Sequence, residues 1–204
     1  MSGADKDGYA KLADFGFATK VEEANPRYPH DKRDRAMSFV GTDHAIPPEV
    51  INNTGQNKSG DWWTLGILLY ELLSGGPPFV VGSQEANTIT LNSMIRRGLA
   101  DDHVWPPRIS KGAIHLIRGL LHTIEKQRLG NQTAEQVKGH EFYHGIDFSL
   151  LVARQLPVPW LPELEDENDI SYFDEPDVAS DYDKDTASVI VNPDDFAEWQ
   201  AWSL

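Results

Sequence analysis

A stretch of nearly uninterrupted apolar residues at 59–76 dominates the hydrophobic pattern of the chain. A helix formed by this stretch would be apolar nearly all round, and such a helix must be buried. A membrane-spanning helix needs about 20 apolar residues, whereas this run is shorter and carries Asp61 and Glu71 near its ends. Ser59 or Asp61 can cap the start of the helix, and Gly75 can end it. The pattern therefore predicts a central core helix rather than a membrane span.

A short alternating segment, Tyr9 to Ala13, follows the dipeptide Asp7-Gly8. A turn dipeptide followed by alternating apolar and polar residues is typical of the turn and second strand of a hairpin. Residues 1–6 precede this turn and have poor strand propensity. We therefore expect the chain to begin inside a structural unit whose first strand is missing.

Two further segments, 86–97 and 110–122, have the apolar spacing of amphipathic helices. The apolar face of the second consists of Ala113, Ile114, Ile117, Leu120 and Leu121. Thr133 and Gln136 have the spacing of a capping box, which predicts a short helix that ends at Gly139.

Charge is concentrated at the C-terminal end of the chain. From Glu163 to Leu204 there are 14 acidic residues and one basic residue, which accounts for −13 of the formal net charge of −14. Hydrophobic residues are sparse there, so the segment alone is predicted to be disordered. The rest of the chain is nearly neutral, which argues against a nucleic-acid partner because phosphate binding needs a basic face.

The chain contains no cysteine, so it can form no disulfide bond. This mildly favours a reducing compartment. The N-terminal residues contain no apolar stretch that could serve as a signal peptide. We therefore expect a cytoplasmic protein.

Six short motifs occur in a fixed order along the chain. They are Asp14-Phe15-Gly16, Gly41-Thr42, Pro47-Pro48-Glu49, Asp61-Trp62-Trp63, Pro77-Pro78-Phe79 and Arg128-Leu129-Gly130. A single Asp-Phe-Gly is a weak signal, but the ordered set is highly specific. The set resembles the C-terminal lobe and tail of a eukaryotic AGC-type serine/threonine protein kinase. The residues in and around the motifs are most similar to those of the cyclic-nucleotide-dependent kinases, cGMP- or cAMP-dependent.

The resemblance implies a truncated protein-kinase-like α+β fold with a mainly helical large lobe, a residual hairpin strand and an extended acidic tail. Residues 1–19 would form the residual strand and the Asp-Phe-Gly motif. Residues 20–49 would form the activation segment, with an unusual polar insertion that reads as a long exposed loop. Residues 50–150 would form the helical large lobe, and residues 151–204 the kinase tail, largely extended or disordered.

The resemblance also implies ATP and Mg²⁺ as cofactors and gives roles to several residues. Asp14 would bind the magnesium that bridges the ATP phosphates, because a carboxylate oxygen is a hard ligand that magnesium accepts. Phe173 resembles a tail residue that reaches the nucleotide. Ser38 matches the activation-loop phosphosite, and Thr42 would support catalysis by hydrogen-bonding the catalytic Asp.

A second group of residues would bind the protein substrate. Phe39 and Ile46 would line a pocket for an apolar substrate residue. Glu71 matches an acid that receives a substrate arginine, in a charge-assisted contact suited to specificity. Between Phe39 and Ile46, this chain has Asp43-His44-Ala45 where the family usually has Pro-Glu-Tyr.

A third group would have structural roles. Glu49 and Arg128 match a buried ion pair that anchors the activation segment to the lobe. Asp61 matches the helix-start acid that holds the catalytic-loop backbone. Phe196 and Trp199 resemble the terminal aromatic motif of the tail, which in the family docks on the small lobe.

One competing motif points to different chemistry. His140-Glu141-Phe142-Tyr143-His144 has the letters of the H-E-x-x-H zinc-hydrolase motif. That motif needs a long helix, whereas Gly139 and Gly145 flank it here, and each glycine weakens a helix interior by about 1 kcal/mol. Zinc hydrolysis is therefore a remote alternative.

The function implied by the resemblance is phosphoryl transfer from ATP to Ser or Thr in protein substrates with basic residues. The 204 residues contain no glycine-rich phosphate loop, no Val-Ala-x-Lys strand and no His-Arg-Asp loop. We therefore expect the chain alone to be inactive, to need a kinase small lobe as partner, and to leave one apolar face of its central helix exposed. The alternative from another class is a non-catalytic binding or decoy fragment, or the product of an incomplete gene model.

Overall fold

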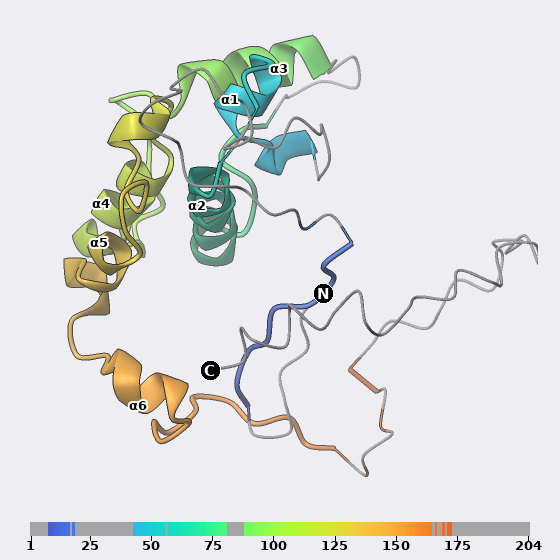
Figure 1. The fold of residues 1–204 in the computed structure, drawn as a ribbon, viewed down its shortest axis with the longest axis vertical. Helices are drawn as coiled ribbons and strands as arrows, with labels where there is room; N and C mark the ends of the chain where they lie inside the picture. The colour runs from blue at the N-terminus through green and yellow to red at the C-terminus, as the bar shows by residue number, and fades with distance from the viewer. Residues whose placement is uncertain are drawn as a thin grey trace, which may run out of the picture. The chain divides into compact units, whose positions relative to one another are not determined.

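The computed structural model describes residues 8–16, 18, 43–55, 57–80, 88–164, 166, 169, 171 and 172. The chain divides into two compact units, residues 1–160 and residues 161–204. The predicted polar loop at 20–37 lies outside the described residues. Figure 1 shows the described elements of the first unit.

The central helix of the first unit is α2, Ser59–Ser74. It ends at Gly75, which takes the left-handed conformation (φ +87°) that a residue without a Cβ adopts without strain. Its predicted side-chain cap by Ser59 or Asp61 is wrong, because the helix starts after Lys58 and no side chain caps it there. Instead the Asn57 side-chain oxygen accepts a hydrogen bond of 2.8 Å from the Ser59 amide.

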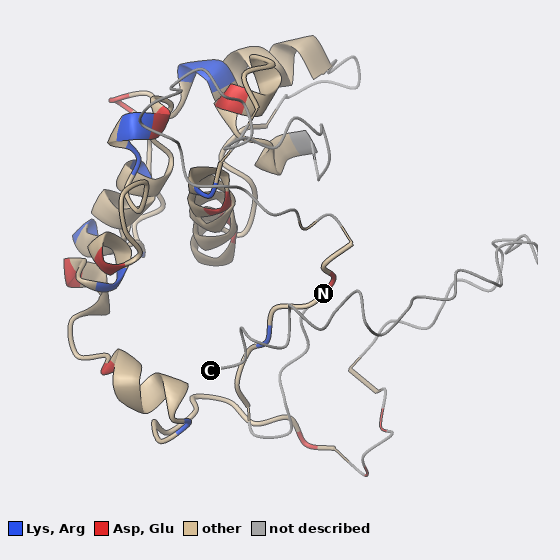
Figure 2. Ribbon diagram, viewed as in Figure 1, with Lys and Arg blue, Asp and Glu red and all other residues tan. Residues whose placement is uncertain are grey.

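The sides of α2 differ in burial. The largest side chains of its buried face are Trp63, Ile67 and Tyr70. On another side of the helix, Leu68 and Leu72 are 49% and 71% exposed. The expectation that one apolar face of this core helix is exposed is therefore confirmed. Figure 2 shows most of α2 in the tan of uncharged residues.

The other described elements of the first unit are shorter helices and turns. In chain order they are the 3₁₀ turn η2 (Asp43–Ala45), α1 (Pro48–Ile51), α3 (Thr88–Arg97), α4 (Lys111–Leu120), the 3₁₀ turn η3 (Glu125–Gln127), α5 (Glu135–Lys138), the 3₁₀ turn η4 (Glu141–Tyr143) and α6 (Phe148–Val152). The predicted helices at 86–97, 110–122 and 133–139 therefore correspond to α3, α4 and α5.

The starts of α4 and α5 differ in how they are capped. Ser110 caps α4, because its hydroxyl accepts a 3.1 Å hydrogen bond from the Ala113 amide. The predicted capping box of Thr133 and Gln136 is not formed, since α5 starts after Ala134 without a side-chain cap. Gln136 instead donates its amide to the Thr133 carbonyl at 3.2 Å, so the chain enters α5 through a tight turn of backbone.

Helices α2 and α4 pack directly against each other. A Cβ added to Gly66 would lie 2.8 Å from a methyl carbon of Leu121 and 2.9 Å from Leu120 Cβ. The absence of a side chain at Gly66 therefore lets the two helices approach closely. The main core cluster around this contact consists of Ile46, Val50, Ile51, Trp63, Ile67, Tyr70, Phe79, Ile95, Ile117 and Leu121.

A second buried cluster lies beside the first. It consists of Leu116, Leu120 and Val137, with Trp62, Leu65, Leu69, Leu129, Phe142 and Tyr143 packed against it. Leu116 was missing from the predicted face of α4, and Ile114, which was included in that face, is only half-buried. The buried face of α4 is therefore shifted from the one predicted, because α4 packs on α5 and η4 as well as on α2.

The predicted hairpin strand at Tyr9–Ala13 is not formed in residues 8–16, which contain only an isolated bridge residue at Ala10. A strand requires a hydrogen-bonded neighbour along its length. This segment makes single contacts instead: the Tyr9 hydroxyl donates to the Leu156 carbonyl at 2.6 Å. Gly8, at φ +78°, lies so close to Val158 that a Cβ would have no room.

In the second unit, the described residues form neither a helix nor a strand. The Glu163 amide donates to the Tyr172 hydroxyl at 3.2 Å, and the Ser171 amide to the Asp169 carboxylate at 2.8 Å. In the described part of the whole chain, no helix has the length and apolar character needed to cross a bilayer.

Candidate functional site

The structure brings Glu49 and Arg128 together, 79 positions apart in the sequence. Arg128 Nη1 donates to Glu49 Oε1 at 2.7 Å, and Arg128 Nη2 donates to Glu49 Oε2 at 2.8 Å. Glu49 is 5% exposed and Arg128 is 2% exposed. Two parallel charge-assisted hydrogen bonds in a buried setting fix both side chains in one geometry.

Arg128 also contacts three other residues. Its Nη1 donates to the Ser59 carbonyl at 3.0 Å, and its Nε donates to the His122 carbonyl at 3.1 Å. Its guanidinium carbon lies 5.2 Å from the centre of the Trp63 ring. One side chain therefore connects α1, the start of α2 and the loop after α4. The two carbonyl partners could not be predicted from the sequence, because every residue has a backbone carbonyl whatever its side chain.

Asp14 lies in the segment 8–16 and is exposed. Its backbone takes φ +64°, a left-handed conformation that is uncommon outside glycine but tolerated by Asp. Its Oδ1 accepts a 3.3 Å hydrogen bond from the Gly16 amide. An exposed carboxylate of this kind fits one ligand position of a magnesium ion, which usually takes one or two carboxylates together with phosphate oxygens.

Asp61 and Ile46 lie in contrasting settings. Asp61 is in the first turn of α2, where it is exposed as a residue, yet loss of hydration around its carboxyl group raises the pKa above 3.8. No hydrogen bond joins its carboxylate to another residue within the described ranges. Ile46 is 4% exposed and belongs to the main core cluster. Its predicted role in a substrate pocket stays a prediction, since Phe39, the other predicted residue of that pocket, lies outside the described residues.

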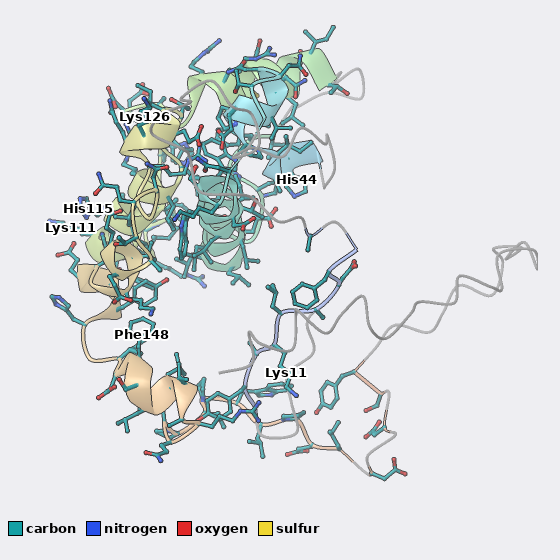
Figure 3. All side chains as sticks on the ribbon, in the orientation of Figure 1. Lys11, His44, Lys111, His115, Lys126 and Phe148 are labelled. Carbon is teal, nitrogen blue, oxygen red and sulfur yellow. The ribbon has the colours of Figure 1, made fainter. Side chains whose placement is uncertain are left out.

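Glu71, near the end of α2, contacts a residue that received no role from the sequence. His44 Nε2 lies 3.1 Å from Glu71 Oε1, and both side chains are about one-third exposed, at 34% and 31%. His44 belongs to η2, and Figure 3 labels it there. The only signal in the sequence was the unusual tripeptide Asp43-His44-Ala45, which placed a basic side chain just before the core residue Ile46.

Six predicted site residues lie outside the described residues. They are Ser38, Phe39, Thr42, Phe173, Phe196 and Trp199. Their predicted roles stay predictions.

The H-E-x-x-H motif does not form a metal site. Its central residues form the 3₁₀ turn η4 rather than a long helix. His140 faces His115 of α4, with its Nε2 2.8 Å from His115 Nδ1, and does not pair with His144. Over the described ranges, no three His, Cys, Asp or Glu side chains are grouped so that they could hold a metal ion. The zinc-hydrolase alternative is therefore not supported.

An aromatic cluster beside the end of α2 was also missed by sequence reasoning. The Tyr70 hydroxyl lies 2.9 Å from His103 Nε2, and the Trp105 ring lies 4.9 Å from the His103 ring. Tyr70 and Trp105 line an open groove of about 520 Å³ together with Ser74, Gly75, Gly76, Pro77, Val104, Pro106 and Pro107. Burial lowers the pKa of His103 below 6.5, and nearby Arg118 lowers it further, against an opposing effect of Asp102.

Acidification should destabilise the fold through the paired histidines. His140 Nδ1 accepts a 3.1 Å hydrogen bond from the Phe142 amide, so the proton of the neutral ring is on Nε2 and is donated to His115 Nδ1. Protonating His140 would set its Nδ1–H against the Phe142 N–H. Burial, and then the charge of His115, lower the pKa of His140 below 6.5, with Glu141 opposing and His144 reinforcing.

Because the folded pKa of His140 lies below the unfolded one, the unfolded chain binds more protons at acidic pH. The stabilisation is present above pH 6.5 and is lost as the pH falls through the folded pKa. We therefore expect a lower urea midpoint at pH 5 than at pH 7.5. His140→Asn, which can still cap η4, should flatten this pH dependence. An unchanged pH profile in His140→Asn would contradict the assignment to His140.

Comparison with known proteins finds a matching family model and several similar proteins. The family model described as "Protein kinase domain" matches residues 4–143. Ribosomal protein S6 kinase alpha-4 of Homo sapiens is 37% identical over 174 residues, which is 84% of this chain and 21% of that protein. cGMP-dependent protein kinase 2 of Homo sapiens is 38% identical over 191 residues, which is 89% of this chain and 23% of that protein.

Serine/threonine-protein kinase gad8 of Schizosaccharomyces pombe is 37% identical over 170 residues, which is 83% of this chain and 27% of that protein. The chain thus spans about a fifth to a quarter of the length of these relatives. The matched residues 4–143 include Asp14, Glu49, Glu71 and Arg128.

Proposed function

This chain belongs to the protein kinase domain family, and from that premise we propose that it supplies the substrate-binding and magnesium-binding part of an AGC-type serine/threonine kinase. The observation that carries the proposal is the position of Glu71 and Asp14 within the matched residues. Each presents a carboxylate that a ligand can reach. The substrate class would be proteins with basic residues near the phosphorylated Ser or Thr.

The proposed roles of these residues follow from the chemistry of phosphoryl transfer, which depends on positioning and on electrostatic stabilisation. Asp14 would hold magnesium, which when bound neutralises charge on the ATP phosphates. Glu71 would receive a basic side chain of the substrate. The buried pair of Glu49 and Arg128 would keep the segment before α2 fixed on the lobe.

Within this proposal, the 204 residues alone do not transfer phosphate, because their sequence has no glycine-rich loop and no His-Arg-Asp loop. We expect no measurable transfer from ATP to a serine peptide rich in arginine by the purified chain. When the same residues are joined to a kinase segment that carries both loops, transfer should appear, and Asp14→Asn should reduce it by at least about 100-fold.

The matched control for Asp14→Asn is Asp102→Asn, which removes an exposed carboxylate outside the proposed site and should leave transfer unchanged. Phosphate transfer by the 204 residues alone would contradict the expected inactivity. Equal activity of Asp14→Asn and Asp102→Asn in the joined protein would contradict the role of Asp14. Calorimetry with ATP and magnesium measures binding separately from transfer.

A non-catalytic binding fragment is the second candidate function. The exposed leucines of α2 and the reachable carboxylate of Glu71 favour it. It predicts that the chain binds basic peptides and that no joined segment confers transfer.

A further inference from the structure

The carboxylate of Glu71 is already occupied by a side chain of the same molecule. His44 Nε2 lies 3.1 Å from Glu71 Oε1. Among the described residues, Glu71 Oε2 has no hydrogen bond of its own. A histidine nitrogen carries a single N–H and engages one carboxylate oxygen, whereas a guanidinium can engage both oxygens in parallel.

His44 is held in this place by the residues next to it. The turn η2 packs against α2 and α3. The Ala45 carbonyl accepts a 3.4 Å hydrogen bond from Thr64 Oγ1, and Ile46 is 4% exposed in the main core. Thr64 and Glu71 are seven positions apart, which puts them on the same face of α2 two turns apart. The backbone of η2 therefore lies along that face and directs His44 to Glu71.

The charges around the Glu71 carboxylate would allow a more strongly cationic group than the His44 imidazole to bind it. Helix α2 carries Asp61 in its first turn and Glu71 near its end, and it contains no Lys or Arg. No Lys or Arg in the described ranges forms an ion pair with Glu71. Histidine is only partly protonated near neutral pH, whereas arginine is always charged. An arginine of a ligand would therefore outcompete an imidazole for this carboxylate.

We propose that His44 is an internal competitor that occupies the Glu71 carboxylate and must be displaced before a basic side chain of a peptide can bind there. This inference rests on the proposed role of Glu71 in substrate binding. It makes His44 a residue that determines specificity: it weakens binding of every peptide that reaches Glu71 and selects peptides whose charge is strong enough to displace the imidazole.

The test is fluorescence anisotropy at pH 7.5 with the purified chain and a labelled peptide of three arginines flanked by glycines. A matched peptide with glutamine in place of arginine reports binding that does not depend on charge. His44→Ala should tighten binding of the arginine peptide by about two- to fivefold, the range for one partly exposed ionic contact. His44→Ser should do the same, which guards against a folding defect in one variant.

The remaining variants separate this inference from the proposed function. Glu71→Gln should weaken arginine-peptide binding, and adding His44→Ala to it should give no further change, since the competed group is gone. His144→Ala, an exposed histidine elsewhere, should bind like the unmodified chain.

Two outcomes would overturn the inference in different ways. If Glu71→Gln weakens binding while His44→Ala and His44→Ser do not tighten it, His44 is no competitor and the role of Glu71 stands. If Glu71→Gln binds the arginine peptide as the unmodified chain does, the proposed role of Glu71 fails and the inference fails with it.

Discussion

Replacing Arg128 with methionine should lower the free energy of unfolding by about 3 to 5 kcal/mol, because it leaves the Glu49 carboxylate buried without its partner. Both side chains are at most 5% exposed, and the pair is joined by hydrogen bonds of 2.7 and 2.8 Å. The change also removes the N–H groups that donate hydrogen bonds to the Ser59 and His122 carbonyls. Urea denaturation followed by circular dichroism measures the loss.

Two further variants make the interpretation specific. Arg97→Met, at the exposed end of α3, should change the free energy of unfolding by no more than about 0.5 kcal/mol. Glu49→Leu combined with Arg128→Met should cost less than the sum of the single changes, because no charge is then left buried alone. A single Arg128→Met variant as stable as Arg97→Met would show that the ion pair does not hold the lobe together.

Replacing Trp63 with alanine should also cost about 3 to 5 kcal/mol, through loss of buried apolar contact and the cavity left behind. The Trp63 side chain has no exposed surface and lies parallel to the Phe79 ring, with ring centres 6.0 Å apart. The Arg128 guanidinium carbon lies over the Trp63 ring as well, 5.2 Å from its centre. The same denaturation experiment measures the effect.

Trp63→Phe should cost much less than Trp63→Ala. The Trp63 ring nitrogen is buried and finds no acceptor among the described residues, so phenylalanine removes no hydrogen bond from it. Trp160→Ala is the matched control, since Trp160 is 52% exposed and its loss should leave stability almost unchanged. Equal effects of Trp63→Ala and Trp160→Ala would contradict the packing argument. Because Trp63 and Arg128 touch, their combined effects should not add.

Local sequence chemistry predicted the helices well and their starting residues poorly. The glycine at position 75 ends α2, and the hydroxyl of Ser110 starts α4, because each acts on backbone groups within a few residues. The predicted cap at Ser59 and the predicted capping box at Thr133 are wrong. A cap depends on which residue is the last with non-helical backbone angles, and neighbouring turns decide that.

Whether the hairpin strand forms and how far α2 is buried depend on neighbouring segments, which the hydrophobic pattern alone does not identify. Alternation at Tyr9–Ala13 predicts a strand, but a strand forms only where a neighbour pairs with it. An apolar helix predicts burial, but burial needs enough surrounding surface, and Leu72 stays 71% exposed. In both cases the sequence favours one local structure, and the tertiary contacts determine whether it forms.

The candidate site divides in the same way. By itself the sequence determined the residue types, their order and the family likeness, since motif spacing is a linear property that reflects local backbone needs. Only the tertiary structure decided that Arg128 reaches Ser59 and His122 in addition to its predicted partner Glu49, and that His44 faces Glu71. Those contacts join positions far apart in the chain and involve backbone carbonyls or side-chain directions, and no linear pattern encodes either one.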